Sequence, residues 1–350
     1  MKTLLYKVLF TLLLVPLVSI AGTDKGKYTK EKKLNKSYIV NGNAGTSVAN
    51  KYGSIFITTW DENRTEIDVL IKVSGNSEDD VTKRLNGIDV EFSASKSLVT
   101  AKTLMGNFRG GNTNLEINYT IKIPKNGTLG LANQYGSIRL GKIYGDINLL
   151  CQYGDVIIDE LNGDGNTLKL QYCGSVKIDY CKKAEINAQY SDLNLGKLNT
   201  LQLSSQYSDT NLGSVDNLNY KAQYSDLNIR AVGTIIGTGS YSDLSFGAVN
   251  GLLNVTTNYG DLHIANLGKN VKNVTIVASY TDVRLNYDAN IAFDFEFTGQ
   301  YGDVSGLENL RITEKATKSS SSMYKGYYRT SGVGRMYIKT QYGDVSLSKF

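Results

Sequence analysis

Aspartate recurs at a nearly fixed interval along much of this sequence, and carboxylates in such a pattern could hold a metal ion. The triplet Tyr-Ser-Asp at 207–209 returns at 224–226, after 17 residues. Carboxylates stacked on neighbouring strands could bind Ca²⁺, which prefers several oxygen ligands. They could instead accept hydrogen bonds from backbone N–H groups at a bend, which is the role we expect. The aspartates of this pattern are Asp146, Asp155, Asp192, Asp209, Asp226, Asp243, Asp261, Asp282, Asp303 and Asp344.

The tyrosines of the same triplet could form either an aromatic stripe that binds sugars or a column inside the protein. Apolar residues alternate before Tyr207, at Leu201 and Leu203, and continuing the alternation puts the tyrosine on their side. We therefore expect the tyrosines inside the fold and the aspartates at its corners, with no role in catalysis. The best-matched copies are Tyr190 with Asp192, Tyr207 with Asp209, Tyr224 with Asp226, and Tyr241 with Asp243.

Glutamine precedes most of these tyrosines and is expected to face outward. Stacked amides stabilise strands by bonding to one another, and an outward row of them could also bind glycans. The residues are Gln134, Gln152, Gln171, Gln189, Gln206, Gln223, Gln300 and Gln341.

The segment 311–335 interrupts the repeat and combines aromatic residues with charge, a mixture favoured at recognition sites. It could also be a flexible loop. The candidate ligand-binding residues are Tyr324, Lys325, Tyr327, Tyr328 and Arg329.

Several kinds of chemistry find no support in the residues. His263 is the only histidine, which argues against a Ser-His-Asp triad and against His-rich metal sites. No phosphate-binding loop or dinucleotide fingerprint occurs, so we expect no cofactor. The cysteines Cys151, Cys173 and Cys181 do not have zinc-site spacing; Cys173 and Cys181 could be bridged, but spacing alone does not decide the pairing.

The elements that carry these residues are repeated strands. The interval between triplet tyrosines is 17 from Tyr190 to Tyr241, then 18, then 21. Inward steps of two describe straight strands, and each step of three places two consecutive residues outside, as a bend requires. Three such steps fit in one period, so each period is one coil with three bends. The last interval, from Tyr301 to Tyr342, spans about two coils.

Stacked coils of this kind predict an all-β fold, a single-stranded parallel β-helix or β-solenoid with coils of about 17–21 residues over 131–350. Parallel strands would lie about 4.8 Å apart, and the crossover rule favours a right-handed coil. Residues 38–130 read as further strands with one helix, at SEDDVTKRL, and predict a small β-rich cap.

The N-terminal residues predict export. Residues 1–21 combine lysines, a short apolar run and small residues, as a cleaved secretory signal does, and no later segment could span a membrane as a helix. Residues 22–37 are lysine-rich and read as a basic linker, or as an arm that touches an anionic surface. The remaining chain is close to neutral, which argues against nucleic acid as a partner.

The segments TTWDENRTEIDVLIKVSG and YTIKIPKNGTLGLANQYGSIRL, followed by serial QYGDV and QYSDL copies, resemble the bacterial putative-adhesin β-solenoid families. The resemblance covers about 38–350. It implies a single-stranded β-helix, export, and an adhesive or envelope role, and it supplies no active-site residues.

We therefore expect an exported, non-catalytic adhesin or cell-envelope protein in the periplasm, at the outer cell surface or outside the cell. Its flat polar surface would bind a cell-surface glycan or protein. The alternative is a carbohydrate-active β-helix enzyme, either a lyase or a hydrolase of polysaccharides. Such an enzyme needs long loops around a cleft, whereas the coils from 190 to 260 are short and uniform.

Overall fold

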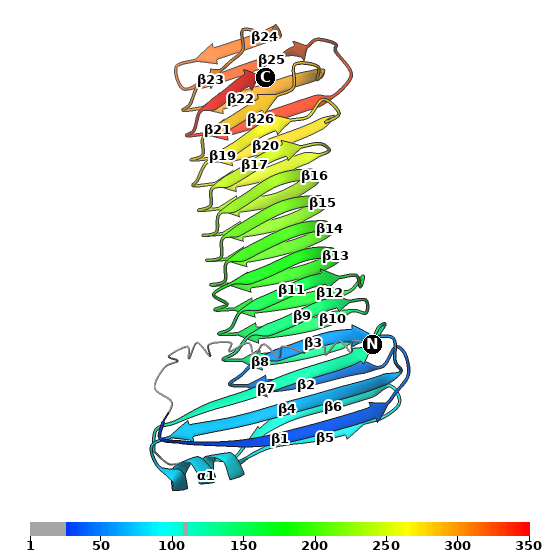
Figure 1. The fold of residues 1–350 in the computed structure, drawn as a ribbon. Coiled ribbons are helices and arrows are strands. Elements are labelled where there is room, and N and C mark those ends of the chain that lie inside the picture. The colour runs from blue at the N-terminus through cyan, green and yellow to red at the C-terminus, as the bar shows by residue number, and fades with distance from the viewer. Residues whose placement is uncertain (1–25, 108–110) are drawn as a thin grey trace, which may run out of the picture.

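The computed structural model describes residues 26–107 and 111–350, so the expected signal at 1–21 lies outside the described residues. Its strands form a single 27-stranded sheet that winds into a long solenoid, with one helix at the N-terminal end (Figure 1). The predicted all-β solenoid with a β-rich N-terminal cap is confirmed.

The N-terminal part contains β1 (Tyr28–Ile39), β2 (Gly45–Lys51), β3 (Ile55–Trp60), β4 (Arg64–Gly75), α1 (Glu78–Asn86), β5 (Ile88–Ala94), β6 (Leu98–Met105) and β7 (Thr113–Pro124). The coils contain β8 (Leu129–Gln134), β9 (Ile138–Ile143), β10 (Ile147–Gln152), β11 (Val156–Leu161), β12 (Asn166–Gln171), β13 (Val176–Gln189), β14 (Leu193–Gln206), β15 (Thr210–Gln223), β16 (Leu227–Ser240), β17 (Leu244–Val249), β18 (Leu253–Asn258), β19 (Leu262–Leu267), β20 (Asn273–Ser279) and β21 (Val283–Tyr287). The C-terminal part contains β22 (Phe293–Gln300), β23 (Val304–Ser305), β24 (Arg311–Lys318), β25 (Ser321–Tyr328), β26 (Arg335–Gln341) and β27 (Val345–Lys349).

Each central coil pairs with the next in a constant register. Leu203 of β14 lies opposite Tyr220 of β15, which lies opposite Gly237 of β16, so the shift per coil is the 17-residue period of the sequence. Gly237 leaves room for its neighbour, since a Cβ there would lie 2.2 Å from Cδ1 of Tyr220. The interval of the sequence repeat therefore equals the offset between paired strands of neighbouring coils.

The coil has the predicted three bends, but the first lies at a different place. In the coil that contains Tyr207, the buried residues run Leu201, Leu203, Ser205, then Ser208, Thr210, Leu212, Val215 and Leu218. Gln206 and Tyr207 therefore face outward together, and the prediction that the tyrosines point inward is wrong. The other two bends flank Val215 closely, so the coil is flattened, with two long sides.

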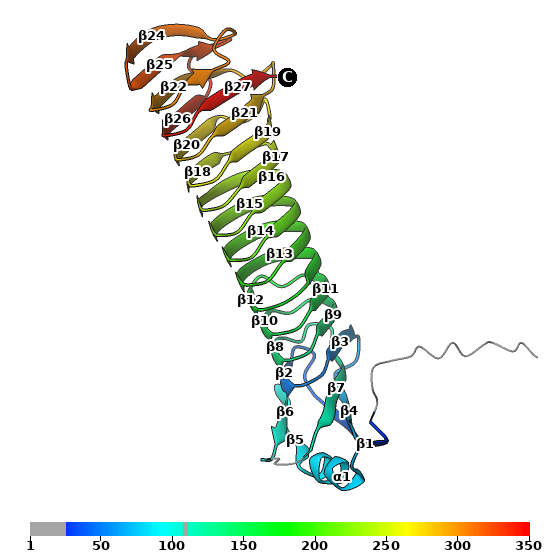
Figure 2. The ribbon, with the colours of Figure 1, turned by 90° about the vertical axis from the view of Figure 1, so that its left-hand side faces the viewer.

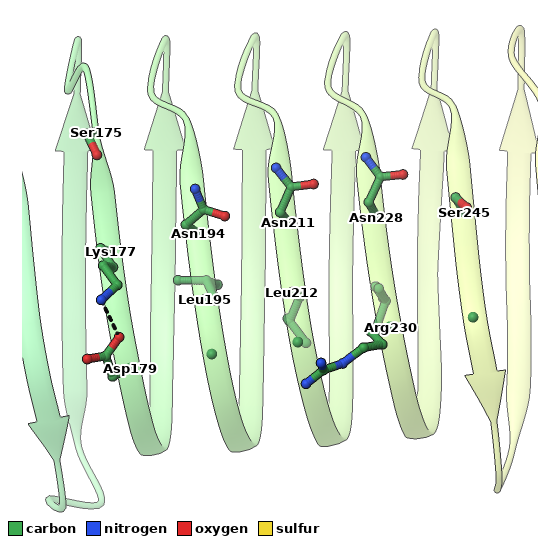
Figure 3. A pocket seen from close by; sticks show the side chains of 14 residues that line it. Ser175, Lys177, Asp179, Asn194, Leu195, Asn211, Leu212, Asn228, Arg230 and Ser245 are labelled. Carbon is green, nitrogen blue, oxygen red and sulfur yellow. Dashed lines mark ion pairs between the residues drawn. The ribbon is translucent and has the colours of Figure 1, made fainter.

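The long sides stand one behind the other in Figure 3. The chain descends along the front strand, passes below and rises along the strand behind, while it advances from left to right. This sense of winding makes the solenoid right-handed, as the crossover rule predicts.

The N-terminal cap continues both sides of the solenoid beyond its first coil. On one side β3 pairs with β7, β7 with β4, and β4 with β1; on the other, β2 pairs with β6 and β6 with β5. The predicted helix forms as α1, and the side chain of Ser77 caps it by accepting from the N–H of Asp80. The cap and the helix close this end of the molecule (Figure 2).

The lysine-rich stretch predicted as a linker is largely part of the cap. Residues from Tyr28 onward form β1, which pairs with β4 over its whole length. Lys30 forms an ion pair with Glu78 of α1 at 2.9 Å, and Lys32 with Asp89 of β5 at 3.0 Å. Charge on an outer strand discourages pairing with further strands, which gives these lysines a structural role.

The C-terminal coil is inserted between two coils that precede it in sequence. β26 pairs with both β20 and β22, and β27 pairs with both β21 and β23. The hairpin of β24 and β25 adds antiparallel to β22 and forms the C-terminal end (Figure 2). The alternative of a flexible loop over 311–335 is therefore wrong, because most of this segment is paired.

We predict that deleting 207–223 leaves a folded solenoid that is one coil shorter. The deletion joins Gln206 to Tyr224, keeps every inward position in phase and lets β14 pair with β16. The lost stability should equal about one coil's contribution, because each coil contacts mainly its neighbours. Circular dichroism and thermal unfolding measure the result.

The matched control is a 16-residue deletion, 203–218. It joins Gln202 to Asn219, two outward residues, and shifts the following strand by one position. Its melting temperature should fall clearly below that of the 17-residue deletion, and equal stability of the two variants would contradict the register.

Candidate binding surface

A row of tyrosines follows the outer corner of the coils from end to end. Each of the twelve has a left-handed backbone, with φ between 50° and 62°. Neighbouring rings stack with centroids 4.8–5.2 Å apart and planes within 14° of parallel. In stacking order the row is Tyr52, Tyr135, Tyr153, Tyr172, Tyr190, Tyr207, Tyr224, Tyr241, Tyr259, Tyr280, Tyr342 and Tyr301.

These rings are surface groups, which corrects the interior position expected from alternation. Apart from Tyr52, they are 42–54% exposed. A left-handed backbone costs roughly 1–2 kcal/mol per residue, and a stacked aromatic pair contributes about 0.5–1.5 kcal/mol. Stacking on both neighbours is thus of the right size to offset the strained corner. Tyr144 lies outside this row and contacts Lys125 instead, at 5.2 Å.

The residue after each tyrosine faces inward, and the Ser and Gly copies connect neighbouring coils in two different ways. In the Ser copies, Oγ of Ser208 accepts from the N–H of Ser191 at 3.0 Å and donates to the carbonyl of Gln206 at 2.9 Å. In the Gly copies the coils approach directly, and a Cβ on Gly154 would lie 2.1 Å from the carbonyl oxygen of Gly136. Close approach therefore selects glycine here, while the positive φ falls on the tyrosine.

Six of the ten aspartates accept a hydrogen bond from a backbone N–H, as we expected. The carboxylate of Asp209 accepts from the N–H of Asp226 at 2.9 Å, and that of Asp226 accepts from the N–H of Asp243 at 3.0 Å. In the same way, the carboxylate of Asp282 accepts from the N–H of Asp344. Within the described residues, no three His, Cys, Asp or Glu side chains gather as a metal site would require.

The glutamine ladder forms over part of the row. The amide of Gln152 donates to Gln171, Gln171 to Gln189 at 3.1 Å, and Gln189 to Gln206 at 3.3 Å. Each of these amides is hydrogen-bonded to the amide of a neighbouring coil. A structural role for this ladder is therefore supported.

A groove of about 670 Å³ runs across the outward side of β13 to β17, on the side that leaves the tyrosine corner (Figure 3). Asn194, Asn211 and Asn228 are in register along it, flanked by Lys177 and Ser245. Glycines at 196, 213 and 247 leave its floor low.

The charged groups of the groove differ in their pairing. Lys177 and Asp179 form an ion pair at 2.9 Å. Arg230 leans toward the neighbouring coil, where its Nη2 lies 3.6 Å from the position a Cβ on Gly213 would take. Among the described residues it has no ion-pair partner within reach.

The sequence reasoning missed this asparagine row. Asparagine stands four residues after the tyrosine in three consecutive copies, and that repetition was the available signal.

The five residues predicted to bind a ligand lie on and just after β25, where several of them hold the hairpin together. Tyr328 is buried, and its hydroxyl donates to the carbonyl of Ala289 at 3.0 Å, so it cannot serve as a contact residue. Arg329 donates to the same carbonyl. Lys325 lies between Glu296 and Glu314, at 3.9 and 4.0 Å.

The two remaining tyrosines of this set are covered by cations. Tyr324 lies beneath the ammonium of Lys315, and Tyr327 beneath the guanidinium of Arg311, each 5.5 Å from the ring centre. A role for Tyr324 and Tyr327 in binding stays a prediction.

The cysteines are free and buried. Cys173 lies at the tyrosine corner of its coil, and Cys181 lies at the opposite, narrow end, where it pairs with Leu198. Cys151 and Cys173 share a hydrogen bond that raises the pKa of the Cys151 thiol, with burial adding to the effect. The same bond lowers the pKa of Cys173 to about 7.

Comparison with known proteins identifies a family for nearly the whole chain. The model of the Toastrack DUF4097 family matches residues 47–348. No curated protein matches in sequence. Across the described residues, no helix has the length and apolar character needed to cross a membrane.

Three solved structures are similar over most of the chain. A "putative cell adhesion protein" from Clostridium sporogenes is 12% identical, covers 91% of this chain and 100% of its own, and has a TM-score of 0.18. A "putative adhesin" from Bacteroides fragilis is 11% identical, covers 93% of this chain and 100% of its own, and has a TM-score of 0.27. A "putative lipid binding protein" from Parabacteroides distasonis is 9% identical, covers 93% of this chain and 98% of its own, and has a TM-score of 0.29.

We predict that Tyr224→Ala destabilises the protein by about 1–3 kcal/mol, the contribution of two stacked pairs. Tyr224→Gly should be at least as stable as the alanine variant, because glycine adopts φ near 50° without strain. Tyr224→Phe keeps the stack and serves as the control. Chemical denaturation measures all three, and a glycine variant less stable than the alanine variant would contradict the role given to the backbone.

We predict that Ser208→Ala costs roughly 1–3 kcal/mol, because it leaves the buried N–H of Ser191 without its acceptor. Ser214→Ala, at a bend where the hydroxyl has no such partner among the described residues, should stay within about 0.5 kcal/mol of the wild type. Thermal unfolding of both variants tests the comparison; equal effects would show that the hydroxyl does not connect the coils.

Proposed function

We propose that this chain, which belongs to the Toastrack DUF4097 family, is an exported, non-catalytic adhesin-like protein that binds a cell-surface glycan or protein along its solenoid. The observation that carries the proposal is the continuous row of half-exposed tyrosines. Exposed aromatic residues gathered on one surface favour recognition, because they offer large contact area with few rotatable bonds.

The stacking fixes how this surface would bind. Each ring face is covered by the next ring, so only ring edges and hydroxyl groups face a partner. The rings are already ordered before binding, which lowers the entropy cost of association. An array of hydroxyls and apolar edges suits a sugar chain or a polar protein surface.

The charge distribution argues against nucleic acid as the partner. Asp209, Asp226 and Asp243 stand in an outward row two residues after the tyrosines, and Asp209 and Asp243 are exposed. Phosphate backbones bind to lysine and arginine, and a carboxylate row would repel them.

We predict that replacing Tyr190, Tyr207, Tyr224 and Tyr241 together with phenylalanine weakens binding at least tenfold while the fold is kept. The change removes the hydroxyls and preserves the ring stack. Binding of the purified protein to glycan and extracellular-matrix arrays measures it, with circular dichroism as the folding check.

The matched control changes Lys221 and Thr238 to alanine. These are outward residues of the same coils, on the long side that leads into the tyrosine corner. Array binding that survives the tyrosine changes, or falls equally in the control, would contradict the proposed surface. Release of new reducing ends from any bound polysaccharide would show catalysis and overturn the non-catalytic role.

A further inference from the structure

We propose that the groove across β13 to β17 binds a neutral linear polysaccharide whose chain runs along the solenoid axis, with one sugar unit per coil. This inference rests on the proposed function, because it names a ligand class and a second site, beside the tyrosine row, for the same adhesive protein. The juxtaposition that carries it is a row of unpartnered amides beside a low floor.

The amides of Asn194, Asn211 and Asn228 are free to bind a ligand. Unlike the glutamine ladder, these side chains make no hydrogen bond to the described residues. Their strand positions are in register, so their amides repeat at the spacing of parallel strands, about 4.8 Å. Each amide offers a donor and an acceptor to solvent.

The spacing favours a sugar chain over a peptide. An extended β-linked pyranose chain advances by roughly one strand spacing per sugar, so successive hydroxyls can meet successive amides. An extended peptide advances about 3.3 Å per residue and repeats its side chains every two residues, which does not match. The backbone N–H and C=O groups of the central coils are already paired with neighbouring coils.

The charges around the groove favour a neutral chain. Asp192, Asp209, Asp226 and Asp243 stand two residues before the asparagine and serine positions, on the same outward side. Arg230 is a single cation against this row, and the charge of Lys177 is balanced by Asp179. An anionic polysaccharide would be repelled along most of the groove, whereas carboxylates accept readily from sugar hydroxyls.

The test measures binding of cellohexaose, a neutral β-1,4-linked chain, by titration calorimetry. We expect the wild type to bind it at least tenfold more tightly than either maltohexaose, whose α-links coil the chain, or hexagalacturonate, which is anionic. Asn194→Ala, Asn211→Ala and Asn228→Ala together should weaken binding at least tenfold.

Two controls accompany the triple variant. Asn219→Ala with Asn254→Ala changes outward asparagines on the other side of the coils and should leave binding within about twofold. Arg230→Gln keeps a donor but removes the charge, so it should lower the affinity for hexagalacturonate more than the affinity for cellohexaose. Circular dichroism confirms that each variant is folded.

The remaining outcomes overturn the inference in distinct ways. Binding of cellohexaose by the triple variant as tight as by the wild type would remove the site. Tighter binding of hexagalacturonate than of cellohexaose by the wild type, or a smaller loss of hexagalacturonate binding than of cellohexaose binding in Arg230→Gln, would contradict the choice of a neutral chain. Failure to bind any of the three oligosaccharides would remove the inference, while array binding that depends on the tyrosine hydroxyls would leave the proposed function standing.

Discussion

The left-handed corner at each tyrosine is the constraint on which the rest of the solenoid depends. It turns the chain between two long sides while using only Gln206 and Tyr207, in the central copy, as outward residues. Such a backbone is unfavourable for tyrosine, so one corner in isolation would be strained. Repeating it in register lets every ring lie on the next, and the compensation grows only when coils stack. Local strain and the long-range repeat therefore stabilise one another.

The two ends of the molecule solve the problem that this repetition creates. A stack of parallel strands ends in unpaired edges that would recruit further strands. On one side of the solenoid the outermost strand at the N-terminal end is the lysine-rich β1. At the C-terminal end an outermost strand is β24, all of whose residues are exposed and which includes Arg311, Glu314 and Lys315. Both ends switch from parallel to antiparallel pairing before they stop. The lysines that suggested a linker are thus part of an edge that ends the sheet.

The repeat could be predicted from the sequence because its period equals the strand register, as Leu203 opposite Tyr220 illustrates. The direction of the tyrosines could not be predicted from alternation, since moving one bend by a few positions leaves the 17-residue period unchanged. The small residue after every tyrosine was the informative signal: Ser208 is buried and Tyr207 is exposed. Inside the coil, the Tyr220 ring does lie against a small residue, Gly237 of the next coil. The order of the last coils depends on pairing between distant segments, which no local pattern contains.

The surface ladders differ in whether their hydrogen bonds are already satisfied, and this difference separates structural from binding roles. Along part of the row the glutamine amides bond to one another, and the aspartates at 209, 226 and 243 accept from the next coil, so these groups stabilise the stack they belong to. The half-exposed tyrosines and the exposed asparagines at 194, 211 and 228 repeat at the same spacing. A repeating protein can thus present a repeating set of unsatisfied groups to a repeating ligand. Each coil added to the stack extends the binding surface by one further unit, at the cost of ordering one more coil.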